Sequence, residues 1–241
     1  MKSIKYLLIQ ARKANDPMII HEKLCFARAL KCEINNIQTK DIIRENINEK
    51  DIINTDAVII GGSGDFSIAK GGSWLNKVLN FMNFLYNNSK VTFASCWGFQ
   101  AMAKARGGHV INNINQAELG TTELWLNQNG KKDNIFKKLP DKFLAQMGHE
   151  DIVTKLPENA ILLASSKKVK NEAFTFKNKP IYCTQFHPEL NKYDLKKRMK
   201  TYPRYIKKIL GITEKEFMEK YCQETTDTDQ LMVNFIKEYI D

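Results

Sequence analysis

The chain has 241 residues, 43% of them apolar, and this length suffices to bury a sizeable core in one α/β domain with or without a helical extension. No apolar run is long enough to cross a bilayer, and the short apolar stretch near the start ends too soon for a signal peptide, so we expect a cytoplasmic protein without a membrane partner. The five cysteines include no C-x-x-C pair, which favours reduced thiols over disulfides or a metal site.

The net charge of +10 raises the question of a nucleic-acid partner. Only six of the 37 basic residues are arginine, whose planar fork is favoured in specific phosphate and base recognition. Lys, Asn and Ile are abundant throughout the chain, which is typical of a compositional bias rather than of a binding surface. We therefore do not expect nucleic acid as a partner.

Short apolar runs alternate with longer helical patterns, which predicts an α/β fold with a mainly parallel, twisted sheet flanked by helices. The first strand is expected over residues 4–10, and a helix over residues 17–30 with Asp16 as its N-cap. A buried strand follows at residues 57–60. Apolar residues at helical spacing predict another helix over residues 73–87.

A glycine-rich turn, Gly-Gly-Ser-Gly-Asp at residues 61–65, follows the second strand. Phosphate-binding loops carry G-K-[ST] or G-x-G-x-x-G, and this turn has neither pattern. Glycines also allow backbone N–H groups to turn inward, where they can stabilise a developing oxyanion. The turn is therefore a candidate oxyanion loop rather than a nucleotide site.

Residues 91–105 are the most informative segment, because a buried strand over residues 91–94 runs directly into a helix with Cys96 at the junction. This is the layout of a nucleophile elbow, in which a strained turn presents the reactive atom at the end of the sheet. Ala94 and Gly98 are the small residues that such a turn needs. The helix N-terminus is expected to lower the pKa of the thiol. A lone cysteine after a strand is a buried structural thiol about as often, so the assignment needs a partner base.

One of the four histidines, His187, follows an apolar strand expected over residues 181–185. If the chain stays extended, His187 and Glu189 lie on the same side, and Pro188 keeps the residue before it out of the helical region. The carboxylate can then hold one ring nitrogen and leave the other as a general base toward a thiol. His-Pro-Glu alone would more often be a structural corner, but together with the cysteine elbow it predicts a Cys–His–Glu triad.

The remaining segments predict what surrounds this core. Between residues 108 and 177 the apolar runs are shorter and are separated by Asn, Gly and Pro, which predicts antiparallel strands covering one edge of the sheet. The tail is expected to be helical, with Thr213 as an N-cap and Glu216 completing a capping box. We expect one domain over residues 1–190 and a helical extension over residues 191–241 that packs on it.

The stretch from Lys192 to Lys208 holds eight basic residues against one acidic residue, Asp194. Its apolar residues recur at near-helical spacing, which favours a helix docked on the domain with a solvated lysine face. Docking onto an acidic synthase or onto nucleic acid is the alternative.

Taken together, the elbow, the glycine turn and the F-H-P-E segment resemble the class I (triad-type) glutamine amidotransferases, such as the glutaminase domain or subunit of GMP synthetase. The resemblance covers residues 4–190. The elbow A-S-C-W-G-F-Q resembles the family's G-x-C-x-G-x-Q, with Ala94 in place of the first glycine. Ser63 stands where the family usually has a proline after the second loop glycine. Neither change removes a reacting group.

The resemblance implies a role for each of these segments. Cys96 would be the nucleophile, His187 the base and Glu189 its orienting acid. Gly62 and Trp97 would supply the backbone oxyanion donors. The residues expected at the substrate would touch its amino-acid end or hold its α-groups through their backbone, and they are Gln100, Met147, Gly148 and His149.

The resemblance also implies the chemistry. The thiolate would attack the δ-carbonyl of glutamine, ammonia would leave, and water would hydrolyse the γ-glutamyl thioester, with no metal or cofactor. The residues carry no synthetase domain or ATP-binding motif. Three functions stay open: a subunit that delivers ammonia to a separate synthase, a free-standing hydrolase of glutamine or γ-glutamyl compounds, and a non-catalytic binding protein on the same scaffold. A homodimer is compatible with each of them.

Overall fold

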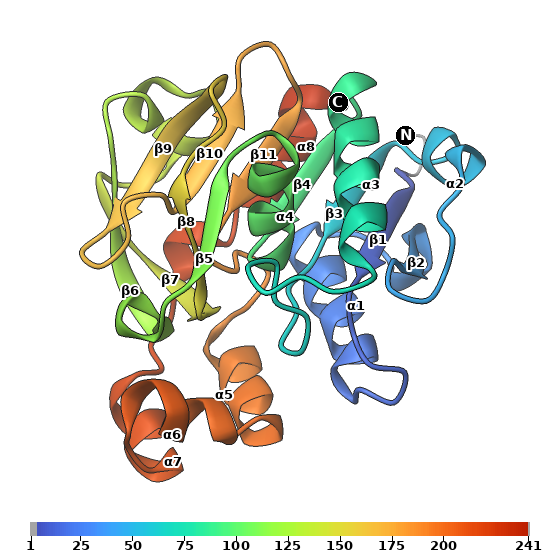
Figure 1. The fold of residues 1–241 in the computed structure, drawn as a ribbon. Helices are drawn as coiled ribbons and strands as arrows, with labels where there is room; N and C mark the ends of the chain where they lie inside the picture. Colours follow the sequence, from blue (N-terminus) through green and yellow to red (C-terminus); the bar gives the residue numbers. More distant parts are fainter. Residues whose placement is uncertain (1–3, 241) are drawn as a thin grey trace.

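A nine-stranded sheet forms the centre of the molecule in the computed structural model, which describes residues 4–240 (Figure 1). The strand order is β2-β1-β3-β4-β11-β10-β9-β6-β7. The first five strands in this order pair in parallel. They are β2 (Ile37–Asp41), β1 (Tyr6–Gln10), β3 (Ala57–Ile60), β4 (Thr92–Ser95) and β11 (Ile181–Thr184).

The other four strands of this sheet pair antiparallel, from β11 outward. They are β10 (Ala173–Phe176), β9 (Ala160–Ser166), β6 (Glu118–Leu126) and β7 (Lys142–His149). The antiparallel strands predicted at one edge of the sheet are confirmed for these four strands. They cover the β11 edge of the parallel half by extending the sheet, because β10 pairs along β11 and so satisfies its backbone groups. A separate antiparallel pair is formed by β5 (His109–Asn112) and β8 (Asp151–Lys155).

Alternate residues of the buried strand β1 enter two hydrophobic cores on the two faces of the sheet. Leu8 packs in one core with Phe26 and Phe235, and Leu7 packs in the other with Val78. A continuous apolar run forms a strand here because helices cover both faces. Figure 1 shows α3 and α4 on the front face, with α1 and α8 behind.

The helices predicted over residues 17–30 and 73–87 agree with α1 (Met18–Ala29) and α3 (Leu75–Asn87) to within two residues, and α4 (Trp97–Ala105) follows Cys96 as predicted. The other helices beside the sheet are α2 (Glu49–Ile53), which was not predicted, and α8 (Leu231–Tyr239), which lies in the tail predicted to be helical. The Asp16 carboxylate accepts the backbone N–H of Met18 at 2.8 Å, as expected of an N-cap. Short 3₁₀ turns lie at Ile34–Asn36, Ile114–Gln116, Gly130–Lys132, Phe136–Lys138 and Thr226–Thr228.

The tail forms three further helices that pack below one end of the sheet in Figure 1. They are α5 (Lys192–Thr201), α6 (Arg204–Leu210) and α7 (Glu214–Lys220). Thr213 caps α7 as predicted, but the predicted capping box is wrong, because the Glu216 carboxylate pairs with Lys220 at 2.9 Å instead. The α/β fold with a mainly parallel half and a helical C-terminal region is confirmed; a domain boundary at residue 190 stays a prediction.

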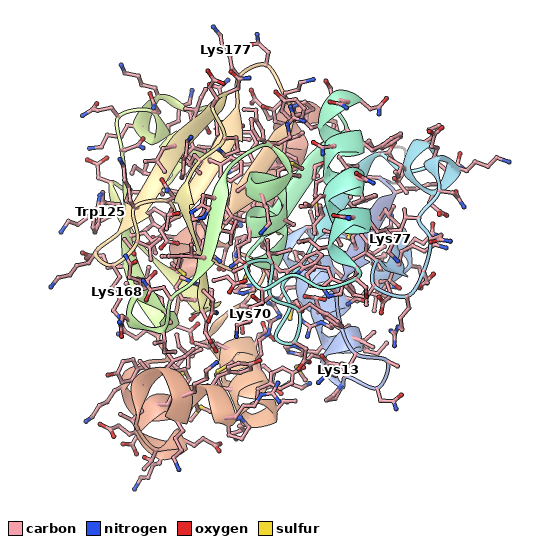
Figure 2. The ribbon with its side chains drawn as sticks, in the orientation of Figure 1. Lys13, Lys70, Lys77, Trp125, Lys168 and Lys177 are labelled. Carbon is pink, nitrogen blue, oxygen red and sulfur yellow. The ribbon has the colours of Figure 1, made fainter. Side chains whose placement is uncertain are left out.

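Two other expectations concern the distribution of positive charge and the absence of a membrane-spanning helix. Figure 2 shows Lys13 and Lys177 at opposite ends of the molecule, consistent with a dispersed charge. Among residues 4–240, no helix has the length and apolar composition that crossing a membrane requires.

Candidate active site

Three predicted motifs meet at the carboxyl ends of neighbouring parallel strands. β4 lies between β3 and β11, with Ala94 opposite Ile60 and Ser95 opposite Thr184. The glycine turn follows β3, Cys96 follows β4, and the F-H-P-E segment follows β11. Because the carboxyl ends of parallel strands share one edge, segments far apart in the sequence form one site there.

Cys96 occupies a strained turn between β4 and α4. Its backbone has φ 51° and ψ −99°, a conformation that side-chain-bearing residues rarely adopt. Its N–H donates to the Thr184 carbonyl at 2.7 Å, which ties the turn to β11. A Cβ at Gly98 would lie 2.7 Å from Ile60 Cγ2 and 3.1 Å from the Ala94 Cβ, so small residues are needed where helix and strand approach. The nucleophile-elbow geometry predicted from the sequence is therefore present.

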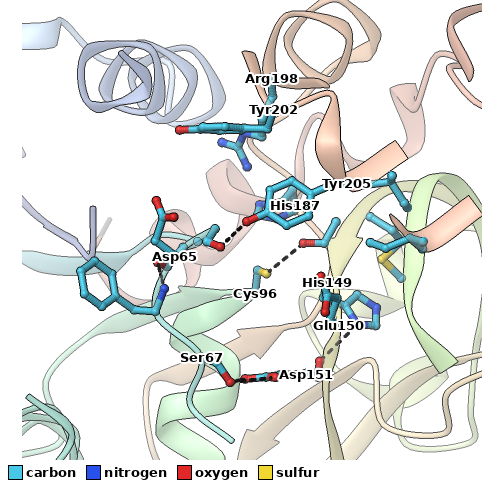
Figure 3. A pocket seen from close by; sticks show the side chains of 18 of the residues that line it. Asp65, Ser67, Cys96, His149, Glu150, Asp151, His187, Arg198, Tyr202 and Tyr205 are labelled. Carbon is cyan, nitrogen blue, oxygen red and sulfur yellow. Dashed lines mark hydrogen bonds between the residues drawn. The ribbon is translucent and has the colours of Figure 1, made fainter. Parts of the chain in front are cut away.

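His187 and Glu189 form the hydrogen bond that the sequence predicts. His187 Nδ1 lies 2.6 Å from Glu189 Oε1, and both residues are buried. The His187 backbone N–H donates to the Gln146 carbonyl at 2.9 Å, which fixes this segment against β7. A Cβ placed at Gly62 would lie 2.8 Å from His187 Cε1 and 3.6 Å from the Cys96 Cβ. The imidazole and the thiol therefore meet beside Gly62, and Figure 3 shows them in one pocket.

The Cys96 thiol has a raised pKa, contrary to the sequence expectation. Burial raises the pKa to about 12; the Arg198 charge and the Trp97 backbone N–H both oppose this rise. The residue is only 4% exposed. The helix N-terminus acts in the expected direction, but the loss of water around the sulfur outweighs it. The free thiol therefore keeps its proton.

The two predicted oxyanion donors differ in their surroundings. The Trp97 N–H favours the charged form of the Cys96 sulfur, so it faces the reactive atom. The Gly62 N–H instead donates to Glu22 Oε1 at 3.2 Å. Glu22 is fully buried and is also held by Arg12 at 2.9 Å. The oxyanion role of Gly62 stays a prediction, and it requires this N–H to leave Glu22.

The residues predicted at the substrate all line the cavity around Cys96, which has a volume of about 230 Å³. The Gly148 carbonyl lies 3.8 Å from the Cys96 sulfur, and Met147 lies beside it on β7. Gln100 Nε2 donates to the Asp151 carbonyl at 2.9 Å. The His149 ring contacts Glu118 at 3.3 Å and the Asp151 carbonyl at 3.2 Å. Its ring nitrogens are thus engaged within the protein, consistent with a positional role.

The tail supplies a part of the cavity wall that was not predicted from the sequence. Arg198, Tyr202, Tyr205 and Lys208 all line the cavity. The sequence predicts a docked helix with a solvated lysine face here, and solvation is wrong for Arg198, which is only 8% exposed. Helical spacing gives no reliable signal for this wall, because Pro203 interrupts the helix between Arg198 and Tyr205.

Two clusters within residues 4–240 bring together groups of the kind that bind metals. They consist of His21, Cys25 and Asp194, and of Glu118, His149 and Glu172, each with ligand atoms within 4.8 Å of one another. In the second cluster, burial and the adjacent Glu118 raise the pKa of Glu172 well above its usual range. A protonated Glu172 can share a hydrogen-bond network with the Ser166 hydroxyl, which also reaches Glu118 at 2.8 Å. Ser166 thus links the two carboxyl groups of the cluster, whereas Glu172 Oε2 has no hydrogen-bond partner among the described residues.

Comparison with known proteins agrees with this geometry. The family model for class I glutamine amidotransferases matches residues 17–200. One relative is a glutamine-hydrolysing GMP synthase subunit of Methanocaldococcus jannaschii, 35% identical over 123 residues, which cover 51% of this chain and 63% of that one. The chain thus spans less than two thirds of this relative's length.

Two further relatives are similar over more of the chain. Gamma-glutamyl peptidase 4 of Arabidopsis thaliana is 28% identical over 194 residues, covering 78% of this chain and 76% of that one. The crystal structure of a glutamine amidotransferase from Thermotoga maritima superposes with a TM-score of 0.78 at 18% identity, with both chains covered in full. The last comparison shows a shared fold, and the family model covers well over half of the chain. This protein therefore belongs to the class I glutamine amidotransferase family.

Proposed function

We propose that this protein hydrolyses the side-chain amide of glutamine, or a γ-glutamyl compound related to it, through a thioester on Cys96. The observation that carries the proposal is the buried His187–Glu189 pair, with 2.6 Å between Nδ1 and Oε1, facing Cys96 across Gly62. A nucleophile, a base and an acid that orients the base are the parts that covalent amide hydrolysis needs.

The raised thiol pKa makes His187 the base of the first step. Glu189 holds Nδ1, so Nε2 is the nitrogen free to take the proton of Cys96 as the sulfur attacks the δ-carbon. The Trp97 N–H would stabilise the oxyanion. His187 then gives the proton to the departing nitrogen as the C–N bond breaks. Water, activated by the same imidazole, hydrolyses the thioester to glutamate and returns the thiol.

We place the glutamyl half of the substrate against β7. Met147 and Gly148 border the sulfur on this side. Gln100 supports the wall from behind through its bond to Asp151. The His149 ring fixes the same segment. Backbone groups of Met147 and Gly148 would then orient the α-amino and α-carboxylate groups.

Delivery of the released ammonia to a separate synthase subunit is our proposal for the product. It is supported by the relative whose name makes it one subunit of a glutamine-hydrolysing GMP synthase. A free-standing γ-glutamyl hydrolase is the second candidate, favoured because the similarity to a γ-glutamyl peptidase extends over 78% of the chain. A non-catalytic binding protein would not need the intact Cys96–His187–Glu189 arrangement. A homodimer stays a prediction.

The function is tested by replacing the proposed nucleophile. Cys96→Ala is expected to reduce glutamate release from glutamine and from γ-glutamyl amides by at least about 1,000-fold, because no thioester can form. Cys32→Ala, which removes a half-buried thiol outside the cavity, is the matched control and should keep the wild-type rate. Coupled measurement of glutamate gives the rates. Full activity in the Cys96 variant would remove the basis of the proposal.

A further inference from the structure

The guanidinium of Arg198 is buried beside Cys96 with unpaired donors. The residue is only 8% exposed and lines the cavity. Its Nε and Nη2 have no hydrogen-bond partner among the described residues. Figure 3 shows the guanidinium reaching from α5 into the pocket, beneath the ring of Tyr202. A buried, always-charged group without partners is unfavourable, so such a group indicates a place for an anion.

Two other cations of the cavity wall have carboxylate partners, and a third, Lys70, is exposed to solvent. Arg12 is bound by Glu22 at 2.9 Å through two of its nitrogens. Lys208 is bound by Glu150 at 2.7 Å. The charge of Arg198 acts on Cys96 and on Glu22, but it forms no hydrogen bond with either of them. Among the cations that line the cavity, Arg198 is thus the buried one without a carboxylate partner, and an anionic ligand would supply that partner.

Arg198 lies on the side of Cys96 where a leaving group departs. Figure 3 shows Arg198 above the sulfur, in the direction of His187, while Asp151 lies below it. The leaving amine must be near His187, because that residue gives it a proton. The glutamyl half belongs on the other side, where the Gly148 carbonyl borders the sulfur at 3.8 Å. A group near Arg198 would therefore belong to the amine half of the substrate.

We propose that Arg198 binds a carboxylate on the amine half of the substrate, so that the preferred substrates are γ-glutamyl amino acids or peptides. A guanidinium can hold a carboxylate through two parallel hydrogen bonds. Glutamine itself releases ammonia, which carries no carboxylate and leaves Arg198 unused. The inference rests on the proposed function, because it assigns the leaving group of the same Cys96 chemistry.

The proposed reaction follows the same steps when the leaving group is an amino acid or a peptide instead of ammonia. The Cys96 sulfur bonds to the γ-glutamyl carbonyl carbon, the C–N bond breaks, and the amino acid leaves with the proton held by His187. Water then cleaves the thioester to glutamate and the free thiol. Arg198 takes part in no proton transfer; it positions the amine half by its charge.

The test compares γ-glutamylglycine with γ-glutamylglycinamide, which differ only in the carboxylate on the amine half. Arg198→Met is expected to lower kcat/KM for γ-glutamylglycine about 100-fold, a loss typical of a truncated buried charge pair. It should lower kcat/KM for the glycinamide by less than about tenfold, a smaller loss that reflects the Arg198 charge acting on the Cys96 sulfur. Lys197→Met removes an exposed charge from the same helix and should alter neither value. Equal losses on both compounds, or no loss on γ-glutamylglycine, would overturn the inference.

A binding measurement separates this inference from the proposed function. Calorimetry with Cys96→Ala, which cannot turn over, should show γ-glutamylglycine binding at least about 30-fold more tightly than in Cys96→Ala/Arg198→Met. If the wild-type protein hydrolyses neither compound but this difference is found, the catalytic proposal fails and the carboxylate site stands. If the two affinities are equal, the carboxylate site is refuted. Thermal unfolding of ligand-free Arg198→Met should show no loss of stability, because the change removes an unpaired buried charge.

Discussion

Burial of the Cys96 sulfur makes its reactivity depend on the presence of a bound substrate. Burial raises the thiol pKa to about 12, and the Glu189 and Asp151 carboxylates favour the neutral form as well. The thiol therefore keeps its proton in the free site. Attack and proton transfer to His187 must occur together once a carbonyl carbon is in place. Such a site is protected from unwanted alkylation and oxidation, because the thiolate is the reactive form.

Glu189→Gln is expected to lower kcat by roughly 100- to 10,000-fold without ending turnover. The carboxylate holds His187 Nδ1 at 2.6 Å and favours the imidazolium formed during attack. Glutamine can still accept that hydrogen bond, but it has no charge and can also present its amide group. Steady-state glutamate release measures the effect, with the exposed Glu158→Gln as the control. An undiminished rate would show that another group orients His187.

The triad could be predicted from the sequence because Cys96 follows one buried apolar strand, and His187 and Glu189 follow another within a few residues. Parallel strands bring their carboxyl ends together, so Cys96 and His187 were expected to meet. The thiol pKa could not be predicted, because it depends on how completely the surrounding segments exclude water. The bond from the Gly62 N–H to Glu22 could not be predicted either. It joins residues 40 positions apart, and no local pattern marks Glu22 as a partner of the glycine turn.

At the scale of single elements, α8 returns the end of the tail to the main sheet. Its residue Phe235 is fully buried and contacts Phe93 of β4 with ring centroids 5.4 Å apart. It also contacts Tyr182 of β11 at 5.7 Å. The two strands that carry the nucleophile and the base are thus covered from behind by the same helix.

Phe235→Ala is expected to lower the free energy of unfolding by about 3–5 kcal/mol, because it leaves a cavity between α8 and the sheet. Ile20→Ala, at a position on α1 that is 63% exposed, should change it by less than about 0.5 kcal/mol. Urea unfolding followed by circular dichroism gives both values. Equal, small effects would mean that α8 does not contribute to the core that supports the site.

In the tail, the positions of the helices are easier to predict from the sequence than the direction in which their side chains point. Its helices were predictable from apolar spacing and caps, but their orientation was not. Pro203 separates α5 from α6, so helical periodicity cannot be carried from Arg198 to Tyr205. The abundance of lysine also favoured a solvated face. Only the packing of α5 over the cavity reveals that Arg198 points inward.

At the scale of the whole molecule, the site is assembled from the sheet, the β7 wall and the tail, and α1 links two of these parts. Arg28 of α1 donates to the Glu189 carbonyl at 2.7 Å and also to the Asp194 carboxylate of α5. His21 of α1 contacts the same carboxylate at 3.1 Å. Through Arg28, Asp194 is therefore one point at which the tail is linked to the segment carrying Glu189.

The charge of Asp194 should make this link dependent on pH. Burial alone would raise the carboxyl pKa, but hydrogen bonds from His21 and Arg28 outweigh burial and lower the pKa from 3.8 to about 2. Because the folded pKa is below the unfolded one, the stabilisation is complete above about pH 5 and is lost as the pH falls toward 2. A shift of this size corresponds to about 2 kcal/mol.

Asp194→Asn is accordingly expected to destabilise the protein by about 2 kcal/mol at pH 7 and by progressively less between pH 4 and pH 3. Urea unfolding at these pH values compares the variant with the wild type, and the exposed Asp227→Asn serves as the control. A deficit that stayed constant down to pH 3 would mean that Asp194 acts through its shape rather than its charge. The shrinking deficit should be accompanied by weaker attachment of α5 to α1, because the carboxylate that loses its charge in acid binds Arg28 and lies on the helix that carries Arg198.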